Sequence, residues 1–424
     1  MRVDAIAAVL RAYATARWRG VRLRSRAAIE RHQARQLTRL MQRAGRDLPF
    51  YRAFAGRSFA EWPVVDKAVL LENFAAMNRA ALPADIVRTA LAAGQEQLAG
   101  QMIGMSTGTS GNRGFYIISE QERFVWLGTI LAKALPDALW RRHKVALALP
   151  ALSGLYQSAH LGSRIDLRFF DLAAGPESWA DSLSAFAPDT IVAPPKVLRW
   201  LAERGRLGAR HIFSGAEVLD LLDRAIIEAA SGHKVREIYM ATEGLFGVSC
   251  SHGTLHLAED VVHFEFTQPD PASALVSPIV TDFTRHTQAM IRYRMNDLLE
   301  LDPAPCACGS AYQAVKRIEG RQDDVFLLTA ADGALKMVTP DVLRNAVVDS
   351  NPEITDFRIV QTGASEIVVT LADGVPRGVD QAVAAQLTAR LARLALTPSI
   401  RFERGISVSF DRKLRRVRRE WRET

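Results

Sequence analysis

The stretch Met105–Gly114 reads MSTGTSGNRG and runs directly into the apolar segment Phe115–Ile118, FYII. Its glycines allow tight bends that bring backbone N–H groups close to an anion, and the hydroxyls between them add further donors. It is not a Walker loop, because no Gly-Lys-Ser/Thr follows at the required spacing. Taken alone, the stretch fits a phosphate-binding loop and a plain Gly/Ser/Thr hairpin equally well.

A second candidate segment is Tyr239–Gly244, YMATEG, which follows the strand-like run Val235–Ile238. An aromatic ring can stack on a purine, a hydroxyl can reach a phosphate, and a carboxylate can hold Mg²⁺ beside it. As a lone hexamer, it also fits a simple turn between a strand and a helix.

A third candidate lies in Ile291–Asp297, IRYRMND, shortly before Gly320–Asp324, GRQDD. The carboxylate of Asp297 can accept both hydroxyls of a ribose, and the guanidinium of Arg321 can pair with a phosphate. Taken alone, these residues are better explained by surface ion pairs.

The segments around these motifs predict an α/β fold with two domains. Residues 1–45 are predicted to be helical. Apolar runs predict buried strands, and an amphipathic run predicts a helix between them: Lys144–Pro150, Thr190–Ala193, His211–Phe213 and the helix Leu219–Ala230. After Gly320 the predicted order is helix, two strands, helix and strand: Asp341–Asp349, Asp356–Gln361, Glu366–Leu371, Val379–Leu394 and Ser399–Glu403. We therefore expect a large layered domain over 1–320 and a small α+β domain over 321–424.

The composition is that of a globular protein. Apolar residues make up 48% and charged residues 24% of the 424 residues, which argues against disorder. The formal charge of +8 suits an enzyme that handles nucleotides and carboxylates, and it also suits binding to nucleic acid or anionic membranes. Three cysteines exclude a disulfide framework and favour the cytoplasm, and no run of about twenty apolar residues predicts a transmembrane helix.

Arginines are dense in the N-terminal stretch, from Arg11 to Arg46. The solvated face of amphipathic helices explains such a pattern. The alternative is a weak contact with a membrane surface or a docking partner.

Together and in this order, the segments resemble the adenylate-forming superfamily of acyl-CoA ligases, peptide-synthetase adenylation domains and luciferases. Within it the chain is most similar to phenylacetate–CoA ligases and their coenzyme-F-synthetase-like relatives. The resemblance covers nearly the whole chain. It rests on these further segments: Ala44–Tyr51, Trp62–Lys67, Ser214–Glu217 and a terminal lysine, Lys413.

The resemblance implies a role for each motif residue. The phosphate loop would consist of Ser106, Thr107, Gly108, Thr109, Ser110 and Gly111. The remaining nucleotide site would comprise Gly215, Ala216 and Glu217 near the adenine, Tyr239 stacked on it, Met240, Thr242 at the α-phosphate, Asp297 at the ribose and Arg321. Glu243 would ligate Mg²⁺, Asp323 would be the hinge of a mobile C-terminal domain, and Lys413 would bridge the carboxylate and the α-phosphate.

Two departures from the family pattern concern basic residues. The phosphate loop ends in Asn112-Arg113-Gly114 where relatives have Pro-Lys-Gly, so Arg113 is a candidate replacement for that lysine. The last motif reads Asp411-Arg412-Lys413 where relatives often have Gly-Lys, which leaves Arg412 and Arg415 as alternatives to Lys413.

The cysteines form two short clusters, Cys250-Ser251-His252 and Cys306-Ala307-Cys308. Three thiolates and the imidazole of His252 would complete a closed tetrahedral zinc site, with His256 as a spare ligand. Three free thiols are the alternative, because the spacings are shorter than Cys-x-x-Cys.

The expected function is ATP-dependent activation of a carboxylic acid, followed by transfer to CoA or a carrier-protein thiol. Transfer to an amine, or an inactive nucleotide-binding partner protein, are the alternatives. A nucleic-acid-binding role is disfavoured, because the sequence shows no recognised module or aromatic platform.

Overall fold

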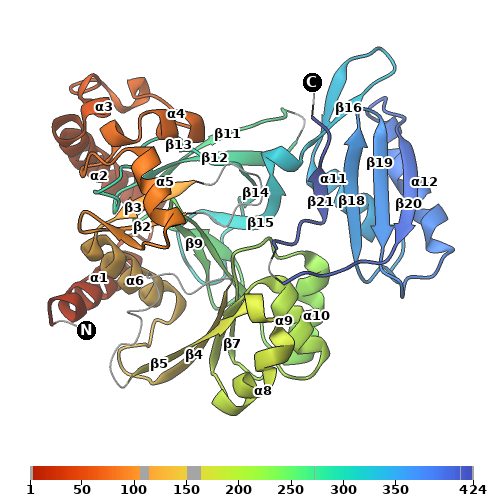
Figure 1. The fold of residues 1–424 in the computed structure, drawn as a ribbon, viewed down its shortest axis with the longest axis horizontal. Coiled ribbons are helices and arrows are strands. Elements are labelled where there is room, and N and C mark those ends of the chain that lie inside the picture. Colours follow the sequence, from red (N-terminus) through yellow and green to blue (C-terminus); the bar gives the residue numbers. More distant parts are fainter. Residues whose placement is uncertain (1–2, 106–113, 150–163, 272, 411, 423–424) are drawn as a thin grey trace.

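The computed structural model describes residues 3–105, 114–149, 164–271, 273–410 and 412–422 (Figure 1). The predicted phosphate loop, Ser106–Gly111, lies outside the described residues. The chain forms a mixed α/β structure around one large sheet, and this confirms the predicted fold class.

The N-terminal segment forms two long helices where one helical stretch was predicted. Helix α1 (Val3–Arg22) and helix α2 (Arg26–Asp47) are separated at Ser25, whose backbone is extended and whose hydroxyl accepts a hydrogen bond from the Ala28 N–H. A serine in this conformation caps a new helix, which explains the break. Shorter helical elements follow: α3 (Pro49–Arg52), η1 (Phe59–Glu61), α4 (Lys67–Glu72), η2 (Ala75–Met77) and α5 (Ala84–Ala92).

Helix α1 packs along helix α6 (Glu120–Ala134), with Val9 buried against Leu127. The two backbones approach closely at Gly128, where a Cβ atom would lie 2.3 Å from the Val9 carbonyl oxygen. A side chain at this position would therefore force the helices apart.

One half of the large sheet is parallel. Its strands lie in the order β5 (Ile165–Asp171), β4 (His143–Leu149), β6 (Thr190–Ala193), β7 (His211–Ser214) and β8 (Val235–Ala241). The connecting helical elements are η3 (Leu172–Ala174), α8 (Pro176–Phe186), α9 (Pro195–Glu203) and α10 (Leu221–Ser231). Strand β4 is apolar almost throughout because a parallel strand with elements packed around it is buried on both faces.

The other half of the sheet is antiparallel and begins at β8. From there the order is β9 (Gly244–Ser249), β10 (Leu255–Leu257), β15 (Ala314–Arg321), β14 (Asp297–Asp302), β12 (Leu275–Asp282) and β11 (Val262–Thr267), with β13 (Tyr293–Arg294) on β12. Strand β8 is thus parallel to β7 and antiparallel to β9. A separate three-stranded sheet consists of β1 (Gln97–Leu98), β2 (Gln101–Met105) and β3 (Phe115–Ile118).

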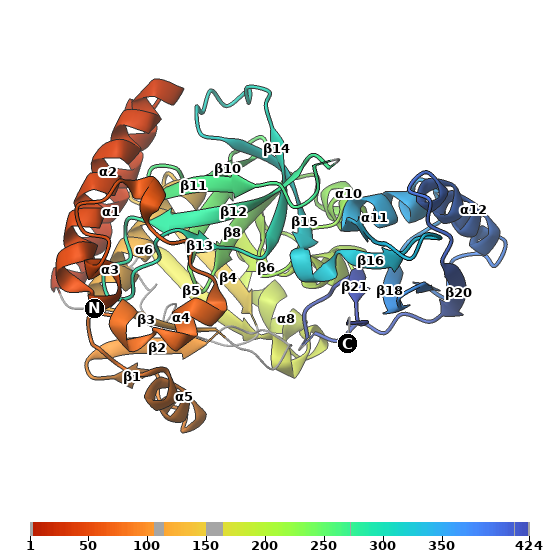
Figure 2. The ribbon, with the colours of Figure 1, turned by 90° about the horizontal axis from the view of Figure 1, so that it is seen from above.

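The residues after β15 lie on one side of the large sheet, away from the N-terminal helices (Figures 1 and 2). They comprise η4 (Gln322–Asp324), the hairpin β16 (Phe326–Thr329) and β17 (Leu335–Val338), helices α11 (Pro340–Val348) and α12 (Val379–Ala392), and a four-stranded sheet. That sheet has the order β20 (Ser399–Arg404), β19 (Glu366–Leu371), β18 (Phe357–Gly363) and β21 (Val417–Arg419). These elements share a hydrophobic cluster of their own, from Phe326 to Val417.

Contacts still join the two parts. Phe410 packs against the cluster formed by β4, β6 and the helices α8–α10, and Leu222 of α10 packs against the C-terminal cluster. Within the described residues, none of the helices combines the length and apolar character that a bilayer crossing requires.

Candidate active site

The turn between β8 and β9 presents two of the predicted residues. Ala241 pairs with Gly244 across the hairpin, so Thr242 and Glu243 are its two turn residues. The Thr242 hydroxyl donates to Glu243 Oε2 over 2.8 Å, and Arg285 Nη1 donates to the Thr242 carbonyl over 3.1 Å. The turn therefore holds a hydroxyl and a carboxylate side by side at the end of a buried strand.

The register between β14 and β15 sets Asp297 directly opposite Arg321. The hydroxyl of Tyr239 donates to Asp297 Oδ2 over 2.8 Å, and burial raises the pKa of both groups. Arg321 acts against that rise at Asp297, which favours the carboxylate form. Three residues predicted to hold the nucleoside thus meet, although they come from three strands.

The turn after β7 contains Gly215, Ala216 and Glu217. Gly215 N–H donates to the Ala193 carbonyl over 3.2 Å, and Ala216 adopts a positive φ of 66°. The carboxylate of Glu217 is buried and forms an ion pair with Lys196 Nζ at 2.8 Å. Burial raises the pKa of Glu217, while Lys196 opposes the rise.

Lys413 lies among these groups. Burial and the nearby Arg321 lower its pKa, whereas the carboxylates of Glu217, Asp297 and Glu243 raise it. Its charge is therefore felt at the three separate segments that carry predicted site residues. Arg321 is a second cation within electrostatic reach of Lys413.

The neighbours of Lys413 have other contacts. Arg415, one predicted alternative, pairs with Asp324 in η4. The carbonyl oxygen of Arg412, the other alternative, accepts a hydrogen bond from Lys196. The predicted hinge residue Asp323 accepts from Asn296 Nδ2 over 2.6 Å, next to the start of β14.

Met240 points to a different environment from that of Tyr239. It lies on β8 and packs against the cluster that contains Phe213 and Ile238. This placement follows from strand geometry, because successive side chains point to opposite faces.

The sequence interpretation missed two lysines at this site. Lys67, at the start of α4, lies within electrostatic reach of Glu243, Arg321 and Asp323, and burial lowers its pKa. Lys196, in the first turn of α9, pairs with Glu217. A signal existed for Lys196, because it follows the end of strand Thr190–Ala193 and parallel strands present their carboxyl ends at one edge of a sheet.

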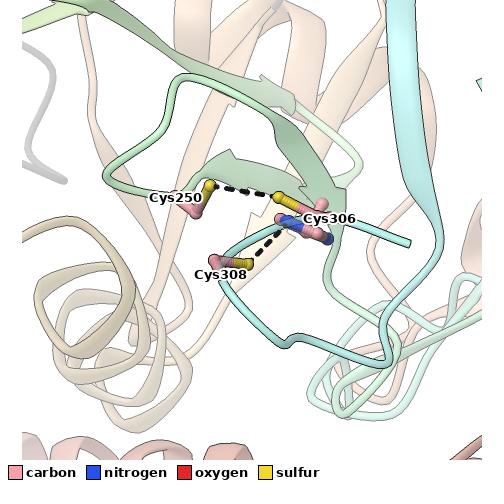
Figure 3. A group of neighbouring side chains, drawn as sticks. Cys250, Cys306 and Cys308 are labelled. Carbon is pink, nitrogen blue, oxygen red and sulfur yellow. Dashed lines mark hydrogen bonds between the residues drawn. The ribbon is translucent and has the colours of Figure 1, made fainter. Parts of the chain in front are cut away.

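The cysteine clusters meet at the far end of the same strands (Figure 3). Cys250 Sγ lies 3.8 Å from Cys306 Sγ, and Cys308 Sγ lies 3.3 Å from His256 Nε2. Zn–S bonds of about 2.3 Å in a tetrahedron put two sulfurs about 3.8 Å apart, so the donor set fits a Zn²⁺ ion. Burial raises the pKa of Cys306, but hydrogen bonds from Cys308, Thr254 and His256 outweigh it and bring that pKa to about 6.

The fourth potential ligand in this cluster is His256, and His252, the predicted ligand, is not part of the cluster. The potential ligand atoms of Cys250, His256, Cys306 and Cys308 lie within 4.8 Å of one another. The Cys250 N–H donates to the Thr254 carbonyl, so residues 251–253 project beyond the hairpin end. His252 lines a separate polar cavity of about 250 Å³, with Lys234 and Glu237. The Nδ1 of His256 lies 3.1 Å from the Tyr312 carbonyl oxygen, an arrangement that leaves Nε2 for a metal.

Solved structures of CoA ligases resemble the chain. A 2-hydroxyisobutyryl-CoA ligase in the postadenylation state, in complex with R3-HIB-AMP, matches with a TM-score of 0.68 at 18% identity, over 93% of this chain and 89% of that chain. The anthranilate CoA ligase AuaEII, in complex with anthranoyl-AMP, matches with a TM-score of 0.54 at 13% identity, over 74% and 65%. ATP-bound MatB from Rhodopseudomonas palustris matches with a TM-score of 0.52 at 16% identity, over 71% and 63%.

No family model matches the chain, and no curated protein matches its sequence. Likeness at these identities shows the fold. The chain has the fold of adenylate-forming CoA ligases, as the order of its motifs predicted.

Proposed function

We propose that this chain, which has the fold of adenylate-forming CoA ligases, activates a carboxylic acid as an acyl- or aryl-AMP with release of pyrophosphate. The observation that carries the proposal is the position of Lys413, whose charge acts on Glu217, Asp297 and Glu243 together. A cation within electrostatic reach of all three segments can neutralise charge where two anions meet.

The reaction asks little covalent chemistry of the protein. The substrate carboxylate is the nucleophile; one of its oxygens bonds to the α-phosphorus of ATP as the bond to pyrophosphate breaks. The chain must hold both anions in line and offset the charge that develops between them. Lys413 fits the second task because it is buried beside the nucleoside-binding residues.

The other site residues are proposed to bind different parts of ATP. Asp297, oriented by the Tyr239 hydroxyl, is proposed to accept the ribose hydroxyls, and Arg321 to contact ribose or phosphate. Thr242 is proposed to donate to the α-phosphate and Ser106–Gly111 to wrap the β- and γ-phosphates. Mg²⁺, held by Glu243, would supply positive charge to the polyphosphate.

We propose that the acyl-AMP is then attacked by the thiol of CoA or of a carrier protein. One of the similar structures, an open conformation of 2-hydroxyisobutyryl-CoA ligase, is in complex with both 2-HIB-AMP and CoA, which supports this step. The phenylacetate–CoA ligase branch, an aryl substrate and a cytoplasmic location belong to the same proposal. In it, the chain divides at 320/321, and Asp323 is the hinge on which the C-terminal domain turns between the two steps.

We also propose one structural Zn²⁺ ion, held by Cys250, His256, Cys306 and Cys308. The cluster lies at the far end of the strands from Glu243 and Asp297. Strands β9 and β14 have six residues each and thus span about 20 Å. The ion would fix the β9–β10 turn against the β14–β15 loop without entering the reaction.

A pyrophosphate–ATP exchange assay with a panel of aliphatic and aromatic acids tests the proposal. Exchange should require both Mg²⁺ and one class of acid. If calorimetry detects no binding of ATP in the presence of Mg²⁺, the chain is not an adenylating enzyme. The same result would reject the alternative of an inactive partner protein that binds nucleotide.

A further inference from the structure

The side chain of Lys196 is buried where the chain segment leading to Lys413 meets the large sheet. Its ammonium pairs with Glu217 at 2.8 Å, with 3% and 4% of the two side chains exposed. It also donates to the carbonyl oxygens of Ser409, over 3.2 Å, and of Arg412. Three acceptors match the three N–H bonds of an ammonium group, so the charge is fully satisfied.

These contacts join positions far apart in sequence. Lys196 lies in the first turn of α9, and Glu217 follows β7, whereas Ser409 and Arg412 belong to the C-terminal segment. The carbonyl of Arg412 is one bond away from the backbone nitrogen of Lys413. Fixing that carbonyl therefore fixes the start of the catalytic side chain.

Neighbouring contacts dock the C-terminal part as a whole. Arg199 Nη1 donates to the Thr355 carbonyl over 3.0 Å, and Arg416 forms a buried two-bond pair with Asp223 at 2.7 and 2.8 Å. These residues hold the C-terminal sheet on α9 and α10. Lys196 differs from them because two of its partners, Ser409 and Arg412, lie within four residues before Lys413.

We propose that Lys196 is a positioning residue, which holds the Lys413 segment in the orientation needed for adenylation and releases it when the C-terminal part turns away. The proposal rests on the proposed adenylation reaction and deepens it. On release, the hydrogen bonds to the Ser409 and Arg412 carbonyls break. The pair with Glu217 stays, because both of its members belong to the large sheet and its helices.

Glu217 gives Lys196 a second effect on Lys413. Both ammonium groups act on the Glu217 carboxylate. If Lys196 loses its charge, Lys413 becomes the cation that compensates this buried carboxylate, and it is drawn away from the reacting carboxylate and phosphate. If the Glu217 charge is removed as well, Lys413 should no longer be drawn away from the reacting groups.

The test compares the two half-reactions in a Lys196→Met variant. The kcat of pyrophosphate exchange should fall about tenfold to a hundredfold, as expected for a displaced catalytic group, with the KM for ATP changed less than about threefold. Thioester formation from supplied acyl-adenylate and CoA should change less than about threefold. A Lys196→Met/Glu217→Gln double variant should recover part of the lost exchange rate.

Lys133→Met is the matched control. It also removes an ammonium from a buried carboxylate, because Lys133 Nζ lies 2.6 Å from Asp260 Oδ1, with 15% of the lysine and 0% of the aspartate side chain exposed. Any of three results would overturn the proposal. Lys196→Met could slow both half-reactions equally, Lys133→Met could slow pyrophosphate exchange as much as Lys196→Met does, or the double variant could be no faster than Lys196→Met.

Hydrogen exchange separates this proposal from the proposed function. The amides of residues 412–416 should exchange faster in Lys196→Met and unchanged in Lys133→Met, whatever acid the enzyme uses. The two claims can fail separately. If hydrogen exchange is faster in Lys196→Met but the chain activates no acid, the proposed function is contradicted and the contact role of Lys196 is kept. Unchanged hydrogen exchange at residues 412–416 in Lys196→Met would reject the contact role of Lys196, even if the enzyme is active.

Discussion

Replacing His256 by Ala should remove zinc from the chain and lower its thermal stability, whereas His252→Ala should do neither. The two histidines are four positions apart, and the structure brings His256, on β10, to the three thiols. This pair of variants therefore tests the geometry of the site, with residue type and neighbourhood matched.

The size of the effect follows from the spacing of the ligands. Cys250 and Cys306 are 56 positions apart, and a cross-link that closes such a loop removes chain entropy worth about 4 kcal/mol. A chain of this length gains on the order of 0.9 kcal/mol per kelvin in entropy on unfolding. Loss of the link should thus lower Tm by about 5 °C.

Elemental analysis and calorimetry decide the outcome. Wild type and His252→Ala should hold about one zinc ion per chain, and His256→Ala much less. The Kd for ATP should change less than about twofold in both, because the cluster lies about 20 Å along the strands from Glu243. A wild-type zinc content far below one, in protein prepared without chelators, or equal contents in the two variants, would refute the reasoning.

Four further predictions concern the proposed active site and the N-terminal surface. Lys413→Ala should slow pyrophosphate exchange about a hundredfold or more with ATP affinity largely kept, because its charge acts in the transition state; an unchanged rate would move the role to a neighbour. Burial and Arg321 lower the pKa of Lys413 below its usual 10.5, so the rate of pyrophosphate exchange should fall as pH rises through that lowered pKa. Glu217→Gln removes a negative neighbour and should shift this fall to lower pH. A pH–rate profile with no such shift would contradict the prediction. Asp323→Pro should slow exchange and thioester formation unequally, and equal losses would argue against domain alternation. Trp18 and Val21, 58% and 57% exposed beside arginines on α1, should support sedimentation with anionic vesicles, which a double Ser substitution weakens; a wild type that binds no vesicles removes the membrane contact.

The sequence predicted elements whose burial pattern is local. Strands Thr190–Ala193 and Glu366–Leu371 have the predicted bounds, and the apolar segment Phe115–Ile118 forms a strand, because short apolar runs between turns are typical of buried strands. The break at Ser25 was missed, because the helical periodicity of the arginine-rich segment continues across it. The antiparallel half of the sheet was missed too, since its register depends on partners tens of residues away.

In the candidate site, too, the sequence indicated residue types but not the long-range contacts between them. The motifs predicted roles for Thr242, Glu243, Asp297 and Lys413, which stay predictions, and they gave no partners for these residues. Lys196 was missed because its contacts lie 213 and 216 positions away, at Ser409 and Arg412. His252 was preferred because it is nearer to Cys250 in sequence, whereas the hairpin brings His256 nearer in space.

The surroundings of Lys413 link substrate binding to its charge. Burial and Arg321 disfavour the ammonium form, and the three carboxylates near it reduce but do not cancel that effect. If a polyphosphate and a carboxylate bind beside this lysine, as proposed, they add negative charge in a buried site, where Coulomb interactions are stronger than in water. Binding thus favours the protonated lysine, and the protonated lysine favours binding by the same free energy. Because Lys196 pairs with Glu217, we expect that carboxylate to compete less for Lys413 and to leave the lysine for the proposed substrates.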